Sequence, residues 1–251
     1  MAQQVLPRRD ARLGRAFGTD ETVQGVVLLL PGGQATGTRR RSSRAAAATL
    51  PLARRLVRAG REELLVAHVV HYRYRGWNGT AAHPVEDVRW ALEEIVRRYG
   101  DVPVCLAGWD MGARAALRAA GHPAVVSVLA LAPWLPDPRT EPEPDPVRQL
   151  IGRRVLLVHG TDDEYTDPEL SYRLAMRAKK INPDVCRFEV HTDGHALRQH
   201  RAEVLALAED FAIGTLCDRD FARPVADALA APPPLGLRMP LAAGFGRSLR
   251  H

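Results

Sequence analysis

Short apolar runs alternate with helical segments along most of the chain, and this alternation limits the possible folds more than any other feature. Several helical segments carry apolar residues on one face and end at a glycine. Parallel strands need a crossover of about a dozen residues or more, which segments of this length provide. The sequence therefore predicts an α/β protein, a three-layer αβα sandwich with a mostly parallel central sheet. The six predicted strands span residues 25–31, 63–71, 102–108, 125–132, 154–159 and 184–190, and the five predicted helices span residues 43–60, 83–99, 111–121, 168–180 and 196–216.

The two ends of the chain do not follow this alternation. Residues 1–21 form a polar arm, residues 22–217 hold the predicted domain, and residues 218–251 are rich in proline and glycine. We expect this last segment not to continue the strands and helices. It is an extended tail on its own domain, or it docks on a partner chain or over the active-site mouth. The interval 133–153 has 21 residues and six prolines, so it has no room for a cap domain.

Composition and charge exclude several classes of protein. Of 251 residues, 46% are apolar and 25% are charged, as in globular proteins. Most arginines behind the net charge of +6 lie beside acidic residues on predicted helices, whereas nucleic-acid binders gather them in a patch. The apolar runs are shorter than the roughly 20 residues of a membrane span. Without an apolar leader, and with three separated cysteines, we expect a cytoplasmic protein that binds neither nucleic acid nor membrane. Its oligomeric state stays open.

The most informative motif lies where the third predicted strand meets the third predicted helix. There the sequence reads Gly108-Trp109-Asp110-Met111-Gly112, which has the form of a nucleophile elbow with aspartate at its centre. Small residues are needed on both flanks, because the central residue lies in a strained turn against a closely crossing helix. The motif predicts that Asp110 lies at the carboxyl end of the sheet, where α/β proteins place their chemistry.

Two polar segments follow later strands and complete a pattern. Residues 159–164 read His-Gly-Thr-Asp-Asp-Glu, and residues 191–196 read His-Thr-Asp-Gly-His-Ala. The chain order is therefore nucleophile, acid and histidine, as in the α/β-hydrolases. Over about residues 22–215 the chain resembles the α/β-hydrolase superfamily. Arg75-Gly76 after the second strand resembles the corresponding dipeptide of the dienelactone-hydrolase and prolyl-oligopeptidase-like branch, which has no cap.

The resemblance implies a triad of Asp110, Asp163 and His195, with the neighbouring Asp162 as an alternative acid. We predict a carboxylate oxygen of Asp110 within about 5 Å of one ring nitrogen of His195. The other nitrogen should lie about 2.6–3.2 Å from Asp163.

The same resemblance implies an oxyanion hole beside the triad, and the residues near the strand ends suggest a substrate pocket. The backbone N–H of Met111 and that of Gly33 or Gln34 would form the hole. Aromatic side chains near the strand ends line the pocket or cover the end of the sheet. The candidate substrate-binding residues are Trp109, Tyr72 and Trp77.

Asp110 stands where most of the superfamily has serine or cysteine. In the haloalkane dehalogenase and epoxide hydrolase branches, an aspartate attacks an sp³ carbon and the histidine then activates water. Those branches usually carry a helical cap. Two interpretations therefore stay open. The protein is a hydrolase that cleaves an ester, epoxide or similar bond of a small organic molecule, or it is a catalytically silent protein of this fold that binds a small ligand or partner.

The sequence predicts no cofactor and no metal. The glycine-rich segment 32–38 lacks the lysine of a phosphate-binding loop. His191 and His195 are separated by Asp-Gly, which favours a loop over a metal-binding helix. Residues 39–41 are all arginine and Arg44 follows them. These arginines form a solvated helix flank, or they attract an anionic substrate to the mouth of the site.

Overall fold

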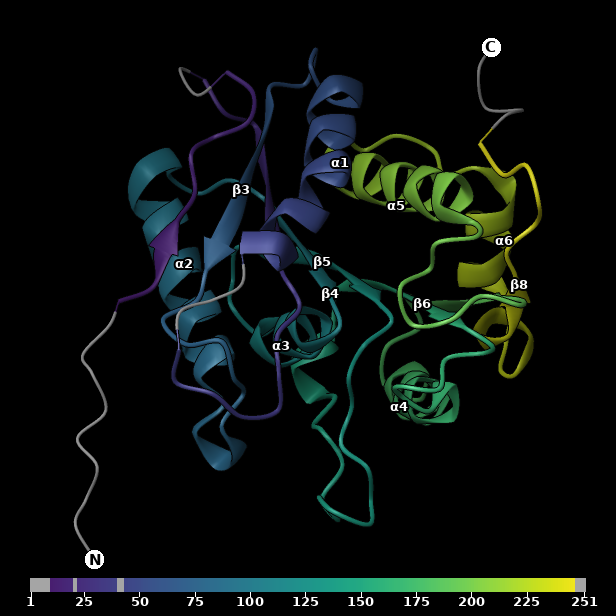
Figure 1. Cartoon of the computed structure of the whole chain (residues 1–251). Helices are drawn as coiled ribbons and strands as arrows, with labels where there is room; N and C mark the ends of the chain where they lie inside the picture. The colour runs from purple at the N-terminus through teal and green to yellow at the C-terminus, as the bar shows by residue number, and fades with distance from the viewer. Residues whose placement is uncertain (1–9, 20–21, 40–42, 247–251) are drawn as a thin grey trace, which may run out of the picture.

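The sheet of the computed structural model, which describes residues 10–19, 22–39 and 43–246, has eight strands in the order β1-β3-β2-β4-β5-β6-β7-β8 (Figure 1). All neighbouring strands pair in parallel except β1 and β3, which are antiparallel. The strands are β1 (Arg12–Leu13), β2 (Gly25–Leu30), β3 (Leu65–His71), β4 (Val104–Trp109), β5 (Val125–Leu131), β6 (Arg154–Gly160), β7 (Val185–Val190) and β8 (Met239–Pro240).

Helices cover both faces of the sheet, which confirms the predicted three-layer sandwich. Helices α1, α5 and α6 lie on one face of the sheet, and α2, α3 and α4 lie on the other (Figure 1). Their apolar side chains form one core cluster on each face. Within the described ranges, no helix combines the length and the apolar composition needed to cross a bilayer. The helices are α1 (Ser43–Ala59), α2 (His83–Tyr99), α3 (Met111–Ala119), α4 (Pro168–Lys179), α5 (Arg201–Leu216) and α6 (Arg223–Ala230), with 3₁₀ helices η1 (Gly79–Ala81), η2 (Arg148–Leu150) and η3 (Leu235–Leu237).

The pairing of the central strands brings the predicted site residues to one edge. All six residues of β2 are buried, because helices cover both faces of the sheet there. The register of β2 with β4 places Leu30 opposite Gly108. Both strands run in the same direction, so the glycines after β2 and Asp110 after β4 emerge side by side at the carboxyl edge.

The segment after α5 corrects the sequence analysis, because it continues the helices and the sheet. It forms α6 and η3, and β8 then adds a further parallel strand beside β7. Val225, Ala228 and Leu237 are fully buried. Pro224 lies in the first turn of α6, where a missing N–H costs no hydrogen bond. The proline content therefore misled the prediction; residues 247–251 lie outside the described residues.

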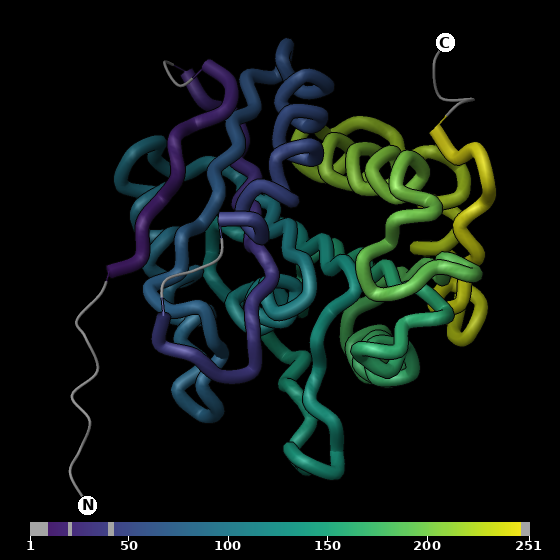
Figure 2. Tube along the Cα trace, viewed as in Figure 1, coloured from purple at the N-terminus to yellow at the C-terminus, as the bar shows by residue number. Residues whose placement is uncertain are grey.

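The interval between β5 and β6, which the structure describes throughout, contains no cap domain; its one regular element is η2. In Figure 2 this teal segment projects from the body of the molecule. Its anchor is Arg114 on α3, whose side chain is 1% exposed. The guanidinium pairs with Asp145 at 2.8 Å and with Glu141 at 2.7 Å. It also lies over the rings of Trp77 and Trp134, at 4.3 and 4.9 Å from their centroids.

Candidate active site

Asp110 occupies a sharp turn between β4 and α3. Its backbone has φ 53° and ψ −120°, a region that residues with a side chain rarely adopt. A Cβ on Gly108 would lie 2.3 Å from the carbonyl oxygen of Gly112, and a Cβ on Gly112 would lie 2.1 Å from that of Leu30. The flanks must therefore be glycine, because backbone crosses closely on both sides.

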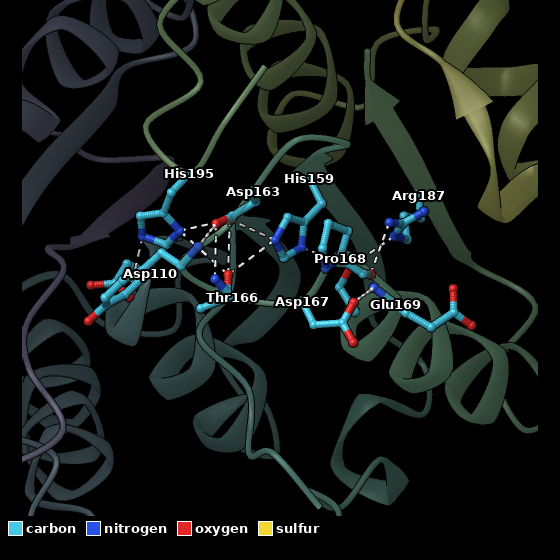
Figure 3. A network of polar contacts seen from close by, with 11 residues as sticks. Asp110, His159, Asp163, Thr166, Asp167, Pro168, Glu169, Arg187 and His195 are labelled. Carbon is cyan, nitrogen blue, oxygen red and sulfur yellow. Dashed lines mark hydrogen bonds and ion pairs between the residues drawn. The ribbon is translucent and has the colours of Figure 1, made fainter. Parts of the chain in front are cut away.

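His195 lies between two carboxylates (Figure 3). Its Nε2 is 3.6 Å from Oδ1 of Asp110, and its Nδ1 is 2.8 Å from Oδ2 of Asp163. Both distances fall within the ranges predicted from the sequence. The ring of Tyr165 packs edge-on against the imidazole, with centroids 4.7 Å apart. The turn after β4, the loop after β6 and the loop after β7 therefore bring the three predicted residues together at one edge of the sheet.

Asp163 is held by five hydrogen bonds. Oδ1 accepts from the backbone N–H groups of Tyr165 and Thr166, each at 2.9 Å. Oδ2 contacts His195 at 2.8 Å, and the Thr166 hydroxyl and His159 Nε2 at 3.0 Å each. Burial alone would raise the pKa of this carboxyl, but the hydrogen bonds from the two histidines and Thr166 outweigh it and hold the pKa far below its usual range. Asp163 is therefore a fixed anion.

Asp162, the alternative acid, is placed differently. It is exposed, and its Oδ1 accepts a hydrogen bond from the Thr161 hydroxyl at 2.9 Å. The contact to His195 thus belongs to Asp163.

The charge of His195 follows from its two neighbours. Burial favours the neutral imidazole, but the carboxylates of Asp110 and Asp163 outweigh it and raise the pKa of His195 to about 9. At neutral pH the ring is therefore protonated, with Nδ1–H directed to Asp163 and Nε2–H facing Asp110.

Of the three oxyanion-hole candidates, Gly33 and Met111 lie beside Asp110, whereas the N–H of Gln34 has another partner. The backbone N–H of Gly33 donates to Oδ2 of Asp110 at 3.1 Å. The N–H of Gln34 instead donates to the carbonyl of Arg75 at 3.2 Å. The structure therefore does not place Gln34 in the oxyanion hole. Met111 is the first residue of α3, and its N–H lies at the helix N-terminus beside Asp110, where a negative charge is favoured.

A pocket of about 250 Å³ opens beside Asp110 and His195. Trp109 lines it, as predicted, but Tyr72 and Trp77 do not: they are only 5% and 1% exposed and pack in the core. Both aromatic residues follow β3 and belong to the core cluster that includes residues of α2 and α3. The remaining lining residues are Gly32, Ala45, Ala48, Thr49, Ala196, Leu197, Arg198, Arg201, Val204 and Leu205.

Two arginines at the pocket were not predicted from the sequence. Arg198 and Arg201 are exposed, line the pocket and have no ion-pair partner among the described residues. Of the predicted arginine cluster, Arg39 and Arg44 are exposed but do not line this pocket, and Arg40 and Arg41 lie outside the described residues. The part of the chain that the structure describes has no group of three or more His, Cys, Asp or Glu side chains arranged to hold a metal ion.

Solved structures with a similar fold are α/β-hydrolases. An esterase of Pyrococcus furiosus superposes with a TM-score of 0.58 at 16% identity, over 78% of this chain and 84% of that chain. Est1E of Butyrivibrio proteoclasticus, solved with ferulic acid bound, gives 0.58 at 12% identity over 83% and 95%. A serine hydrolase without a lid from Xanthomonas campestris gives 0.52 at 16% identity over 81% and 87%. No protein-family model matches the sequence, and no curated protein does so either.

The molecule therefore has the α/β-hydrolase fold, in its form without a cap domain. At these low identities the likeness extends to the fold alone. The Xanthomonas campestris protein is described as a serine hydrolase, whereas this chain carries Asp110 in the turn between β4 and α3.

Proposed function

We propose that the protein is a hydrolase that cleaves an ester, epoxide or similar bond of a small organic molecule through Asp110, His195 and Asp163. One observation carries the proposal. The two oxygens of the Asp110 carboxylate have different partners: Oδ2 accepts from the Gly33 N–H at 3.1 Å, and Oδ1 is 3.6 Å from His195 Nε2. One oxygen is thus held by a backbone donor, while the other, which faces His195, would be the nucleophile.

In the first step Oδ1 of Asp110 attacks an sp³ carbon of the substrate. The bond between that carbon and the leaving oxygen breaks, and its electron pair goes to that oxygen. The protonated Nε2 of His195 gives its proton to the oxygen. The product is an alkyl ester of Asp110 whose carbonyl oxygen, Oδ2, stays on the Gly33 N–H. An ordinary ester would instead require an anhydride at Asp110, which is a poor intermediate.

In the second step water hydrolyses this ester. The neutral His195 takes a proton from the water as its oxygen attacks Cγ of Asp110. Negative charge develops on Oδ2, where the Gly33 N–H stabilises it. Collapse of the intermediate breaks the bond between Cγ and the alkyl oxygen. The alcohol leaves with the proton from His195, and the proton on the restored carboxyl returns to His195. Asp163 holds the imidazole throughout.

Trapping the intermediate tests this proposal. When it is offered epoxides, haloalkanes and esters, His195→Gln should accumulate a covalent adduct on the Asp110 peptide, because the water is no longer activated. The adduct should form most readily with haloalkanes, whose halide leaves without a proton from His195. Asp110→Asn should accumulate none. His191→Gln is the matched control, because this exposed histidine lies in the same loop. A single turnover in ¹⁸O-water should place ¹⁸O in the Asp110 carboxylate, and ¹⁸O found only in the released product would contradict a covalent step.

A second candidate function is binding without catalysis. The observation in its favour is that a structural neighbour is a serine hydrolase, so Asp110 is consistent with a lost serine. If none of the three substrate classes gives an adduct with His195→Gln, and Asp110→Ser gains esterase turnover, the fold serves to bind a small ligand or partner.

A further inference from the structure

A second histidine lies behind Asp163, outside the steps described above. His159, on β6, has a side chain that is completely buried. Its Nε2 is 3.0 Å from Oδ2 of Asp163, the same oxygen that contacts His195. Its Nδ1 is 2.9 Å from the hydroxyl of Ser171 on α4. Figure 3 shows the two histidines on either side of the carboxylate.

The surroundings of His159 determine which of its nitrogens carries the proton. Burial lowers the pKa of His159, and the charges of Arg187 and His195 lower it further, against the opposing effect of Asp163. The ring is therefore neutral and has one N–H. An ionised carboxylate can only accept hydrogen bonds, so that N–H is at Nε2. Nδ1 must then accept, and the Ser171 hydroxyl is its donor.

Arg187 on β7 completes this arrangement. Its guanidinium is 1% exposed, and its Nε donates to the Ser171 oxygen at 2.9 Å. It also donates to the carbonyl of Pro168 at 3.2 Å and to that of Leu237 at 3.0 Å. The Ser171 oxygen lies 2.8 Å from the carbonyl oxygen of Pro168 as well as 2.9 Å from Nδ1 of His159. Because Arg187 also donates to the Pro168 carbonyl, we assign the Ser171 proton to His159. The contact with Leu237 ties the segment after α6 to the same network.

We propose that His159, as its Nε2–H tautomer, is a positioning residue that holds Oδ2 of Asp163 and shares this oxygen with His195. Part of the negative charge on that oxygen is neutralised by the His159 donor. His195 is therefore less basic than it would be beside an Asp163 that lacked this donor. Besides Asp163, the charge of Asp110 acts on His195, and the charge of Arg187 acts on His159.

Nitrogen-15 NMR of the native protein tests the tautomer directly. His159 should show a protonated Nε2 and an unprotonated Nδ1 across neutral pH. A His159 with its proton on Nδ1, or with both nitrogens protonated at pH 7, would overturn the proposal. This experiment needs no substrate. Although the role of His159 in catalysis rests on the proposed function, the tautomer and the adduct on Asp110 can therefore fail separately.

Two substitutions test the effect on His195. His159→Leu removes the donor, and because Thr166 and two backbone N–H groups still hold Asp163, the pKa of His195 should rise by about half a unit or more. His159→Gln keeps an amide donor and should leave that pKa near its native value. If His159→Leu does not fold, the Gln variant and the native tautomer decide the question.

The control is a second buried histidine far from the site. His68 on β3 is 1% exposed and contacts the carbonyl of Gly14 at 2.9 Å and the hydroxyl of Tyr99 at 2.8 Å. His68→Leu should lower the free energy of unfolding without changing the pKa of His195. If His159→Leu likewise destabilises the protein and leaves the pKa of His195 unchanged, His159 is a structural residue and the proposal is wrong.

Discussion

Replacing Asp110 with asparagine removes one of the two carboxylates that face His195, and we expect the pKa of His195 to fall. The rise of this pKa from 6.5 to about 9 in the native protein corresponds to about 3 kcal/mol in favour of the protonated ring. Asp110 and Asp163 share this stabilisation, at 3.6 and 2.8 Å from the two ring nitrogens. Loss of the Asp110 charge should therefore lower the pKa by about one to two units.

This change imitates the proposed reaction, because esterification also makes Asp110 neutral. Before the reaction His195 is protonated at pH 7 and can act as an acid. After the ester forms, the fall in its pKa makes it a base for the water. In the proposed reaction, the attacking carboxylate would thereby control when the histidine becomes a base.

Proton NMR titration of the His195 ring measures the effect, with the signal assigned by its loss in His195→Gln. Asp162→Asn is the matched control, because this exposed carboxylate contacts Thr161 and not His195. A pKa of His195 that stays near 9 in Asp110→Asn would refute the argument. An equal fall in the Asp162 variant would refute it as well.

Three other measurements follow from the described contacts. The pKa of His195 is raised to about 9 in the folded protein, so the protonated ring stabilises the folded state by about 3 kcal/mol at pH values below 6.5. This stabilisation is lost as the pH rises through 9. Urea unfolding at several pH values should show the loss in the native protein but not in His195→Gln. Gly112→Ala would place a Cβ 2.1 Å from the carbonyl oxygen of Leu30 and should lower the free energy of unfolding by about 3 kcal/mol, whereas Gly121→Ala, with its nearest atom at 3.3 Å, should change it little. Arg114→Met leaves the buried carboxylate of Asp145, in the proline-rich interval between β5 and β6, without its main partner. The free energy of unfolding should fall by about 3 kcal/mol in the same assay.

The sequence was most informative where the physical signal is local. Buried strands of a parallel sheet are continuously apolar, so their positions could be predicted to within a few residues. The glycines around Asp110 could be interpreted because a strained turn has few alternatives. The order of the three polar residues then placed them at one edge, since parallel strands all end there.

Predictions failed where tertiary contacts decide the local structure. The last helix of the domain was expected from residue 196, but α5 begins at Arg201. The buried carboxylate of Asp193 accepts the backbone N–H groups of Arg198 and His200 at 3.0 and 2.9 Å, which holds that stretch in turns. β1 has two residues and depends on pairing with β3, so it leaves no pattern in the sequence.

The residues of the candidate site that the sequence did not reveal act through partners distant in the chain. His159 precedes a glycine at the end of a predicted strand and has no local sign of its role. That role depends on Ser171 of α4, which contacts His159, and on Arg187 of β7, which contacts Ser171. Trp77 was expected at a pocket because it follows a strand. Instead it is buried in the core, where the guanidinium of Arg114 lies 4.3 Å from its ring centroid.

The charges of Asp110 and His195 favour substrates in which the bond that breaks ends at an oxygen atom. In a serine hydrolase the nucleophile is uncharged and its histidine starts as a neutral base. Here Asp110 adds a negative charge, and His195 holds a proton up to a pH of about 9. That proton helps a leaving oxygen and does nothing for a halide. Under single-turnover conditions, the rate at which epoxides form the Asp110 adduct should therefore depend on the His195 proton, in the native protein and in His191→Gln alike, whereas the rate with haloalkanes should not. The epoxide rate should decline above pH 9 while the haloalkane rate does not, and an identical pH dependence for both would show that His195 donates no proton.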